Sequence, residues 1–200
     1  AHNNRDQLGS LFGAVEQMRG DLAQSDAHTR RLGAAAERLE GQAEQISERL
    51  AAVALDDYHQ RVLDLAREGA QAIAAQFEAD IERGRIRLED LLDRNYQVIA
   101  NTWPQQYRSR FDDYTDKTLP ALQEPLLSRH EGLVFAIACT PDGYVPTHNQ
   151  AFSAKPTGNR EHDVIHSRSK RLFNDRTGAR CGSHQQALLL QTYTRDTGEL

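Results

Sequence analysis

Apolar residues recur at alternating steps of three and four between residues 8 and 53, and this repeat constrains the fold more than any other feature. The positions of the repeat are Leu8, Leu11, Val15, Met18, Leu22, Ser25, Thr29, Leu32, Ala36, Leu39, Ala43, Ile46, Leu50 and Val53. This spacing puts all of them on one side of a helix and predicts a coiled-coil seam. We therefore expect a coiled-coil helix over residues 1–55, paired in a homodimer.

Glycines interrupt the same segment at several positions, namely Gly9, Gly13, Gly20, Gly33 and Gly41. Each costs roughly 1 kcal/mol relative to alanine inside a helix, so the segment should need a partner helix to be stable. Ser25 and Thr29 are the polar breaks in the seam. They suit a seam that repacks during signalling, and they equally suit an inert spacer whose register they set.

Residues 56–131 read as a helical connector. An amphipathic pattern predicts a helix from Asp56 to about Arg83, with Gly84 as its stop. A short helix is expected in 85–96. Helical spacing resumes over 107–127, although Pro120 and Pro125 should bend or divide that helix.

The pattern changes at residue 132. The apolar run LVFAIAC (133–139) predicts a buried central strand, the turn TPDG follows it, and residues 144–148 should return as its hairpin partner. Helical spacing over 160–173 and a further strand over 187–196 complete the prediction. The expected fold is α+β, a long coiled-coil helix followed by a small antiparallel sheet over 132–200 that we expect to be C-terminally incomplete.

Charge, apolar runs and cysteines exclude several classes of protein. The net charge of −5 argues against a dedicated nucleic-acid binder. No apolar run approaches the roughly 20 residues that a membrane span requires, and the start AHNNRDQLGS does not read as a signal peptide. Two cysteines, Cys139 and Cys181, are too few for a disulfide framework. These observations predict a soluble chain in the reducing cytoplasm.

Five segments carry a resemblance to one family. LGAAAERLEGQAEQISERLAAVAL (32–55) resembles the last part of the cytoplasmic coiled coil of bacterial methyl-accepting chemotaxis proteins. The segment DDYHQRVLDLAREGAQAIAAQFE (56–78), with DGYVPTHN, KRLFNDRTGARCG and LLLQTYTRDTGE, is similar to the C-terminal sensor module of some such receptors. The resemblance implies a Cache-like or PAS-like module that senses a small ligand in chemotaxis. The tip that binds the chemotaxis kinase and its coupling protein has no match in this chain.

Side chains on the expected sheet suggest where a ligand would bind. Tyr144 and His148 share one face of their strand, and Gln191, Tyr193 and Arg195 share one face of theirs. With Arg171 at the edge, these residues predict a pocket for a small, anionic ligand. The open alternative is that one face is the solvent side of the sheet.

The basic cluster RSKRLFNDR is the second candidate site. It contains Arg168, Lys170, Arg171 and Arg176, and it could bind an anion, contact nucleic acid or form internal ion pairs. The negative net charge disfavours nucleic acid, so a carboxylate ligand or an internal ion pair is the better interpretation.

Other motifs suggest further chemistry. HDVIH places His162 and His166 one turn apart, as in H-E-x-x-H zinc proteases, but Asp163 replaces the glutamate that acts as general base, so no catalysis is expected. A non-catalytic metal site could use Cys181, His184 and one of His148, His162 or His166. No other catalytic motif and no cofactor-binding motif is present, so we expect a protein that is not an enzyme and holds no cofactor.

Two questions remain open: whether the coiled coil is methylated, and which function the whole protein has. Glu16-Gln17 and Glu44-Gln45 resemble the acidic and amide pairs that chemoreceptors methylate, although such residues are common on any helix surface. The alternative to a chemotaxis sensor is a structural coiled-coil protein with a C-terminal module for protein interaction or metal binding.

Overall fold

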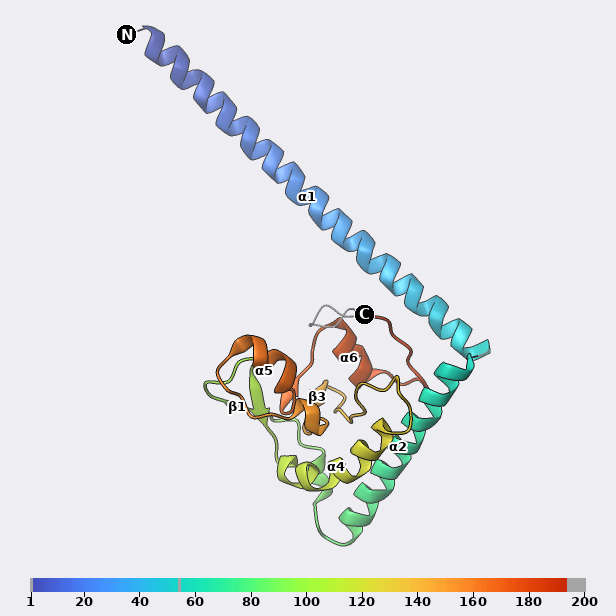
Figure 1. Ribbon diagram of the computed structural model, residues 1–200. Coiled ribbons are helices and arrows are strands. Elements are labelled where there is room, and N and C mark those ends of the chain that lie inside the picture. Colours follow the sequence, from blue (N-terminus) through green and yellow to red (C-terminus); the bar gives the residue numbers. More distant parts are fainter. Residues whose placement is uncertain (1, 54, 194–200) are drawn as a thin grey trace. The chain divides into compact units, whose positions relative to one another are not determined.

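The computed structural model describes residues 2–53 and 55–193. The chain divides into two compact units, with the boundary between Leu50 and Ala51. Within the described residues there are six α-helices and one four-stranded antiparallel sheet (Figure 1). The mixture of helix and antiparallel sheet confirms the α+β class. No helix in the described ranges is long and apolar enough to cross a membrane.

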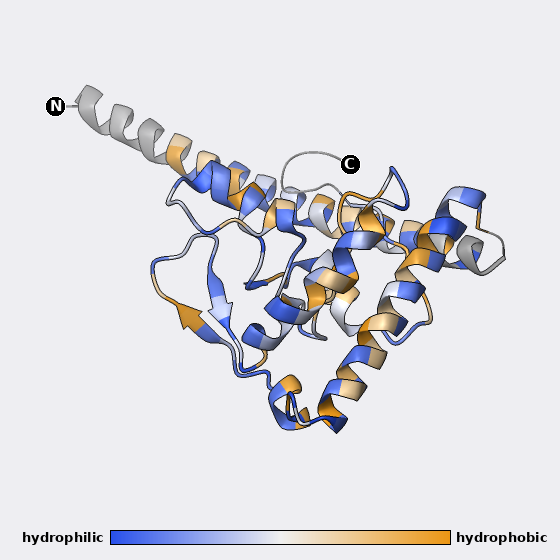
Figure 2. Ribbon diagram, turned by 60° about the horizontal axis from the view of Figure 1, so that its bottom comes forward, coloured by the Kyte–Doolittle hydropathy of each residue, from blue (hydrophilic) through white to orange (hydrophobic). Residues whose placement is uncertain are grey.

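Helix α1 (His2–Val53) contains the heptad segment. Hydrophobic and hydrophilic residues alternate along it in Figure 2. The described side chains on the seam are exposed, from 45% at Val15 to 66% at Leu39. A continuous helix is thus confirmed over His2–Val53, while its pairing in a coiled coil stays a prediction.

Helix α2 (Asp57–Glu82) begins and ends at the residues that the sequence indicated. Asp56 is the N-cap, and its carboxylate accepts the His59 N–H at 2.8 Å. At the other end Gly84 has a φ of +70°, and the Arg85 N–H returns to the Asp80 carbonyl oxygen at 2.8 Å. These bonds form a Schellman motif, which needs a left-handed residue after the C-cap and explains the glycine stop.

The middle of the chain contains less helix than the sequence predicted. Helix α3 (Leu88–Leu91) is one turn long, and strands β1 (Gln97–Ile99) and β2 (Gln106–Arg108) form an antiparallel hairpin. Because Tyr107 is in β2, the following helix α4 (Asp112–Leu127) begins later than the expected residue 107. The prediction of helix throughout the 56–131 connector is therefore wrong at this hairpin.

Helix α4 runs through Pro120 and Pro125 without dividing. Each proline removes one helical hydrogen bond, yet the buried side of the helix holds it in place, with Leu119 and Leu126 in the core. The closest approach is to α2, where a Cβ on Gly69 would lie 2.8 Å from Leu126 Cδ1. The packing of α4 against α2 therefore stabilises the helix more than the two missing hydrogen bonds destabilise it.

The sheet has the order β1-β2-β4-β3, with all pairs antiparallel. Strand β3 (Tyr144–Val145) pairs with β4 (Arg171–Leu172), where Tyr144 faces Leu172 and Val145 faces Arg171. The remaining elements are the 3-10 helix η1 (Gln150–Phe152), α5 (Arg160–His166) and α6 (Arg176–Ser183). Two strands thus come from before residue 132 and two from after it.

The strand expected at 133–139 is absent, and the segment is irregular. Its backbone donors are bound by buried side-chain amides: the Ala136 N–H donates to Asn149 Oδ1 at 2.8 Å, and the Ala138 N–H donates to Gln123 Oε1 at 3.0 Å. Asn149 and Gln123 are almost fully buried. The apolar run is therefore held by side chains without a neighbouring strand, and most of it is half-buried.

Two further predictions near the C-terminus are wrong. The helix expected over 160–173 ends at His166, because the chain then enters the sheet: the Lys170 N–H donates to the Val145 carbonyl oxygen, and the Tyr107 N–H donates to that of Lys170. The strand expected over 187–196 is irregular throughout its described part, residues 187–193. Helix α6 was not anticipated.

The hydrophobic core of the second unit gathers around Ile86, Phe111 and Tyr144. Partly buried apolar and aromatic side chains pack against it, namely Ile81, Leu91, Tyr96, Tyr107, Tyr114 and Leu172. Tyr144 and Leu172 belong to the paired strands β3 and β4, so the sheet contributes one face to this core.

Candidate functional site

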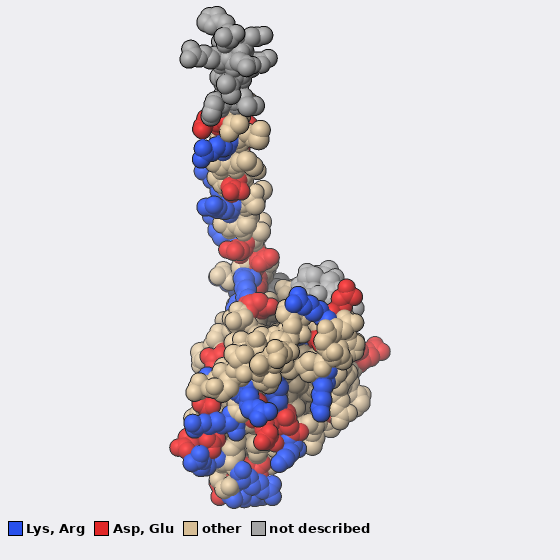
Figure 3. Space-filling model, turned by 90° about the vertical axis from the view of Figure 1, so that its left-hand side faces the viewer, with Lys and Arg blue, Asp and Glu red and all other residues tan. Residues whose placement is uncertain are grey.

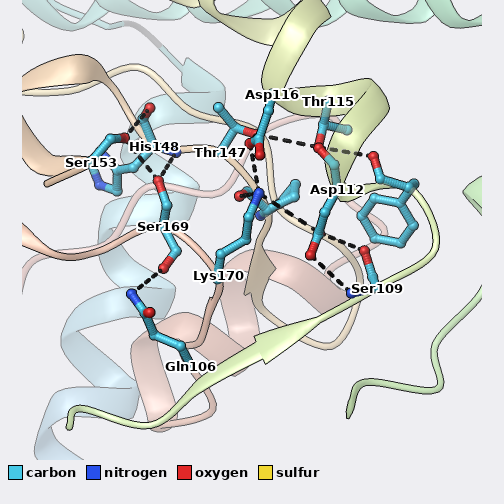
Figure 4. A network of polar contacts seen from close by, with 12 residues as sticks. Gln106, Ser109, Asp112, Thr115, Asp116, Thr147, His148, Ser153, Ser169 and Lys170 are labelled. Atoms are coloured by element: carbon cyan, nitrogen blue, oxygen red, sulfur yellow. Dashed lines mark hydrogen bonds and ion pairs between the residues drawn. The ribbon is translucent and has the colours of Figure 1, made fainter. Parts of the chain in front are cut away.

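The first turn of α4 is the centre of a buried polar network (Figure 4). Asp112 is 5% exposed, and its carboxylate accepts the Ser109 N–H at 2.9 Å and the Ser109 hydroxyl at 2.6 Å. These bonds hold the chain just before the helix, and the helix dipole also favours a carboxylate at this end. The network is thus centred on the buried carboxylate at the start of α4.

Tyr144 joins β3 to this helix start. Its side chain is fully buried, and its hydroxyl lies 3.0 Å from Asp112 Oδ1 and 3.1 Å from the Tyr107 carbonyl oxygen. Burial, together with the negative charge of Asp112, raises the pKa of the Tyr144 hydroxyl well above its ordinary value. The residue therefore serves as a neutral donor between strand and helix.

Lys170 is the cation of the network and has a left-handed backbone, with a φ of +63°. Its ammonium donates to Asp116 Oδ1 at 2.6 Å and to the Pro146 carbonyl oxygen at 2.7 Å, and it lies 4.0 Å from Asp112 Oδ1. Figure 4 shows the ammonium between the two carboxylates. A positive φ is uncommon for lysine, and such outliers concentrate at functional positions.

Thr147 completes the link from the end of β3 to α4. Its hydroxyl donates to Asp116 Oδ1 at 2.6 Å and lies 3.3 Å from the Thr115 hydroxyl. Asp116 therefore accepts from both Thr147 and Lys170. No pattern in the sequence marks Asp112 or Asp116 as site residues, since acidic residues at a helix start are common. Lys170 was predicted only as part of the basic cluster.

His148 lies in a second polar group beside the first. It is 3% exposed, and its ring packs against Phe135 and Phe152, with centroids 5.4 and 5.0 Å away. The Asn149 N–H donates to its Nδ1 at 2.9 Å, which places the proton of the neutral ring on Nε2. The His148 N–H donates to the Ser169 hydroxyl at 2.8 Å.

The residues predicted to line one pocket have different surroundings. Tyr144 packs with Tyr96 and Phe111, whereas His148 packs with Phe135 and Phe152. Gln191 is half-buried and donates to the Thr177 carbonyl oxygen at 3.3 Å, and Tyr193 is 41% exposed. Arg195 lies outside the described residues. The structure thus places Tyr144 and His148 in separate aromatic groups, and joins Gln191 to α6.

The basic cluster separates into two parts. Lys170 turns towards the acidic residues of α4, as described above. Arg168 and Arg171 instead meet at Phe173, with guanidinium carbons 5.1 and 4.7 Å from the ring centroid. Both also donate to the Val164 carbonyl oxygen at 3.2 Å. Two half-buried arginines are thus held over one aromatic ring.

The HDVIH motif has a structural explanation in α5. Asp163 is 1% exposed and accepts the Thr157 N–H, the Thr157 hydroxyl and the Gly158 N–H, at 2.8 to 3.0 Å. Burial alone would raise its pKa, but these bonds outweigh burial and lower the pKa of the Asp163 carboxyl to about 2. Both oxygens hold the preceding loop, so neither is available as a general base.

The metal ligands considered from the sequence do not come together. Within the part of the chain that the structure describes, no three His, Cys, Asp or Glu side chains are grouped as a metal site would require. His162 and His166 do stack, with ring centroids 4.6 Å apart, but without a third ligand. The combination of Cys181, His184 and a further histidine is not found among these residues.

Charged side chains of both signs share the surface of the second unit. On the face drawn in Figure 3, basic and acidic side chains are interspersed over the second unit, as on a mixed, solvated surface.

Comparison of the chain with protein-family models, with curated proteins and with solved structures gave no match.

Proposed function

We propose that this chain carries a small-ligand signal in bacterial chemotaxis, with the unit after Leu50 as sensor and α1 as a coiled-coil transmitter. The observation that carries the proposal is the division of the chain into a long helix with an exposed apolar stripe and a separate α+β unit. An exposed stripe of this length favours association with another helix. In this proposal the chain is not an enzyme and acts in the cytoplasm as a homodimer.

The three C-terminal motifs that resemble the sensor module contact one another, which supports a common role. Tyr144 of DGYVPTHN pairs with Leu172 of KRLFNDRTGARCG across β3 and β4. Gln191 of LLLQTYTRDTGE donates to Thr177 in the second motif. Segments far apart in the sequence thus form one structural unit around α6 and β4.

A chain of contacts could transmit a change at the sheet. Lys170 joins the sheet to Asp116 on α4, α4 packs against α2 at Gly69, and α2 follows α1 in the sequence. Polar networks with discrete arrangements suit such coupling. A ligand would shift the balance between two arrangements only by its difference in affinity for them.

The proposed ligand is a small carboxylate. Arg168 and Arg171 offer two guanidinium groups over Phe173, and arginine binds carboxylates through paired N–H donors. Tyr144, His148, Gln191, Tyr193 and Arg195 remain the candidate lining residues from the sequence. The kinase and its coupling protein would bind a signalling tip outside this chain.

A structural coiled-coil protein with an interaction module is the alternative, because the same exposed stripe on α1 favours it. Its metal-binding form has no support among the described residues. The two functions differ in one testable respect: a sensor must bind a small ligand in the second unit, whereas a structural rod need not.

A thermal-shift screen tests the proposal. The purified chain is heated with acetate, succinate, malate, glutamate or buffer alone, and at least one acid should raise the melting temperature by several degrees, since binding to the folded state stabilises it. Arg171→Ala should lose that shift. Arg87→Ala is the matched control, because Arg87 is an exposed arginine that pairs with Glu89 and Asp90 on α3.

A second measurement addresses chemotaxis itself. The chain is fused after the signalling tip of a chemoreceptor, and kinase activity is measured with and without the acid that bound in the screen. A change in kinase activity that Arg171→Ala abolishes supports the proposal. If none of the acids shifts the melting temperature, the structural alternative is favoured instead.

A further inference from the structure

The two cysteines of the chain are brought together by the packing of α6 against the turn before β3. Cys139 directly precedes the turn Thr140–Gly143, and Cys181 lies in the last turn of α6. A Cβ on Gly182 would lie 2.5 Å from the Thr140 carbonyl oxygen and 2.8 Å from that of Pro141. The residues next to each cysteine are thus in direct backbone contact.

The two thiols differ in exposure and in acidity. Cys139 is half-buried, whereas Cys181 is exposed. The neighbouring Cys181 sulfur, with burial, raises the pKa of the Cys139 thiol far above its usual range, and the Cys139 thiol as a nearby donor lowers the pKa of the Cys181 thiol to about 7. The exposed sulfur is therefore the more reactive of the two, because the thiolate is the nucleophile.

We propose that Cys139 and Cys181 are a redox-active thiol pair that forms an intrachain disulfide with small disulfides such as oxidised glutathione. The roles follow from position: Cys181 is accessible and attacks first, and Cys139 lies behind it and resolves the mixed disulfide. A reducing compartment keeps such a pair reduced until the small-disulfide pool rises. The pair is independent of the proposed ligand site.

The reaction balances without any other reactant. The Cys181 thiolate attacks one sulfur of oxidised glutathione, breaks its S–S bond and releases a glutathione thiolate, which takes up a proton. Cys139 then loses its proton, and its sulfur attacks Cys181 Sγ, which forms the protein disulfide and releases the second glutathione. The protein loses two electrons and two protons, and the small disulfide gains both. The new bond would fasten α6 to the turn before β3.

The test uses the full chain, which contains only these two cysteines. The protein is incubated with oxidised glutathione, quenched with acid and analysed by intact mass and by peptide mapping without reductant. We expect the mass of two hydrogen atoms to be lost, a linked peptide pair containing Cys139 and Cys181, and a rise in melting temperature of roughly 10 °C. Reductant should reverse all three.

Single variants separate the two roles. Cys139→Ser should stop at the mixed disulfide, with one glutathione bound to Cys181, and Cys181→Ser should leave Cys139 largely unmodified over the same time. Circular dichroism checks that each variant is folded. The proposal is overturned if the wild-type chain stays reduced, carries a glutathione on each cysteine, or forms only disulfides between copies; the wild-type result alone decides this if a variant fails to fold.

Discussion

At the scale of single residues, buried polar side chains replace regular secondary structure in the second unit. Gln123 and Asn149 bind the backbone of residues 133–139 in the way that a neighbouring strand would. Asp163 likewise holds the loop at Thr157 and Gly158. Because each unpaired buried group would cost roughly 1 to 3 kcal/mol, such residues are as important to the fold as apolar ones.

Asp163 should make stability depend on acid pH. Its pKa of about 2 lies below the ordinary value of 3.8, so its contribution is fully present above about pH 4 and is lost as the pH falls through 2. We expect Asp163→Asn to lower the melting temperature by roughly 5 °C at pH 7 and to flatten the decline between pH 4 and 2. Circular dichroism melts at stepped pH values measure both effects.

The matched control is Glu131→Gln, which removes an exposed carboxylate in the turn after α4. This variant should keep the wild-type melting temperature and the wild-type decline with acid. If Asp163→Asn instead declines in parallel with the wild-type chain over pH 4 to 2, Asp163 is not the group that titrates.

These residues also show what could be predicted from the sequence. Helix α2 was predicted with its start at Asp56 and its Gly84 stop, because both signals are local. The strand at 133–139 was wrong, because apolar periodicity cannot reveal that two distant amides bind its N–H groups. The network of Asp112, Asp116 and Lys170 was missed for the same reason, since its contacts join segments far apart in the sequence.

At the scale of elements, close backbone contacts position the short elements around the sheet. Helix α6 meets the turn before β3 at Gly182, and α4 meets α2 at Gly69. At the first contact the opposing atoms are carbonyl oxygens, whereas at the second they belong to the Leu126 side chain. A backbone oxygen cannot rotate away as a side chain can, so the Gly182 contact should tolerate substitution least.

Gly182→Ala should therefore destabilise the second unit. The added methyl group would lie 2.5 Å from the Thr140 carbonyl oxygen, so α6 must move away from the turn. We expect a loss of roughly 1 to 3 kcal/mol in the free energy of unfolding, as for other overpacked sites. Urea denaturation followed by the fluorescence of Trp103 in this unit measures it.

Gly33→Ala is the control for that substitution. Gly33 lies in α1 with no atom within 4 Å of the added Cβ, so the change should raise helicity slightly and leave the unfolding of the second unit unchanged. Equal urea midpoints for Gly182→Ala and the wild-type chain would show that the contact at Gly182 is not tight in solution.

At the scale of the whole molecule, the apolar seam of α1 is exposed to solvent in the single chain. The described apolar side chains on it include Met18, Leu22, Leu32 and Ile46, all more than half exposed. The glycine-containing sequence of this helix contributes little to its stability. We therefore expect its stability to come from burial of the seam against a partner helix. The partner in our proposal is a second copy of the chain.

Sedimentation equilibrium should accordingly show a monomer–dimer equilibrium whose average mass rises with concentration. Leu22→Asp and Leu32→Asp place a carboxylate on the seam, and each should weaken the dimer at least roughly 100-fold, because burial of a leucine is lost and a charge must be desolvated. Ala27→Asp adds the same charge opposite the seam and should leave the dimer unchanged, since Ala27 lies between the repeat positions Ser25 and Thr29. A wild-type chain that stays monomeric at every concentration while α1 remains helical would contradict pairing through the seam.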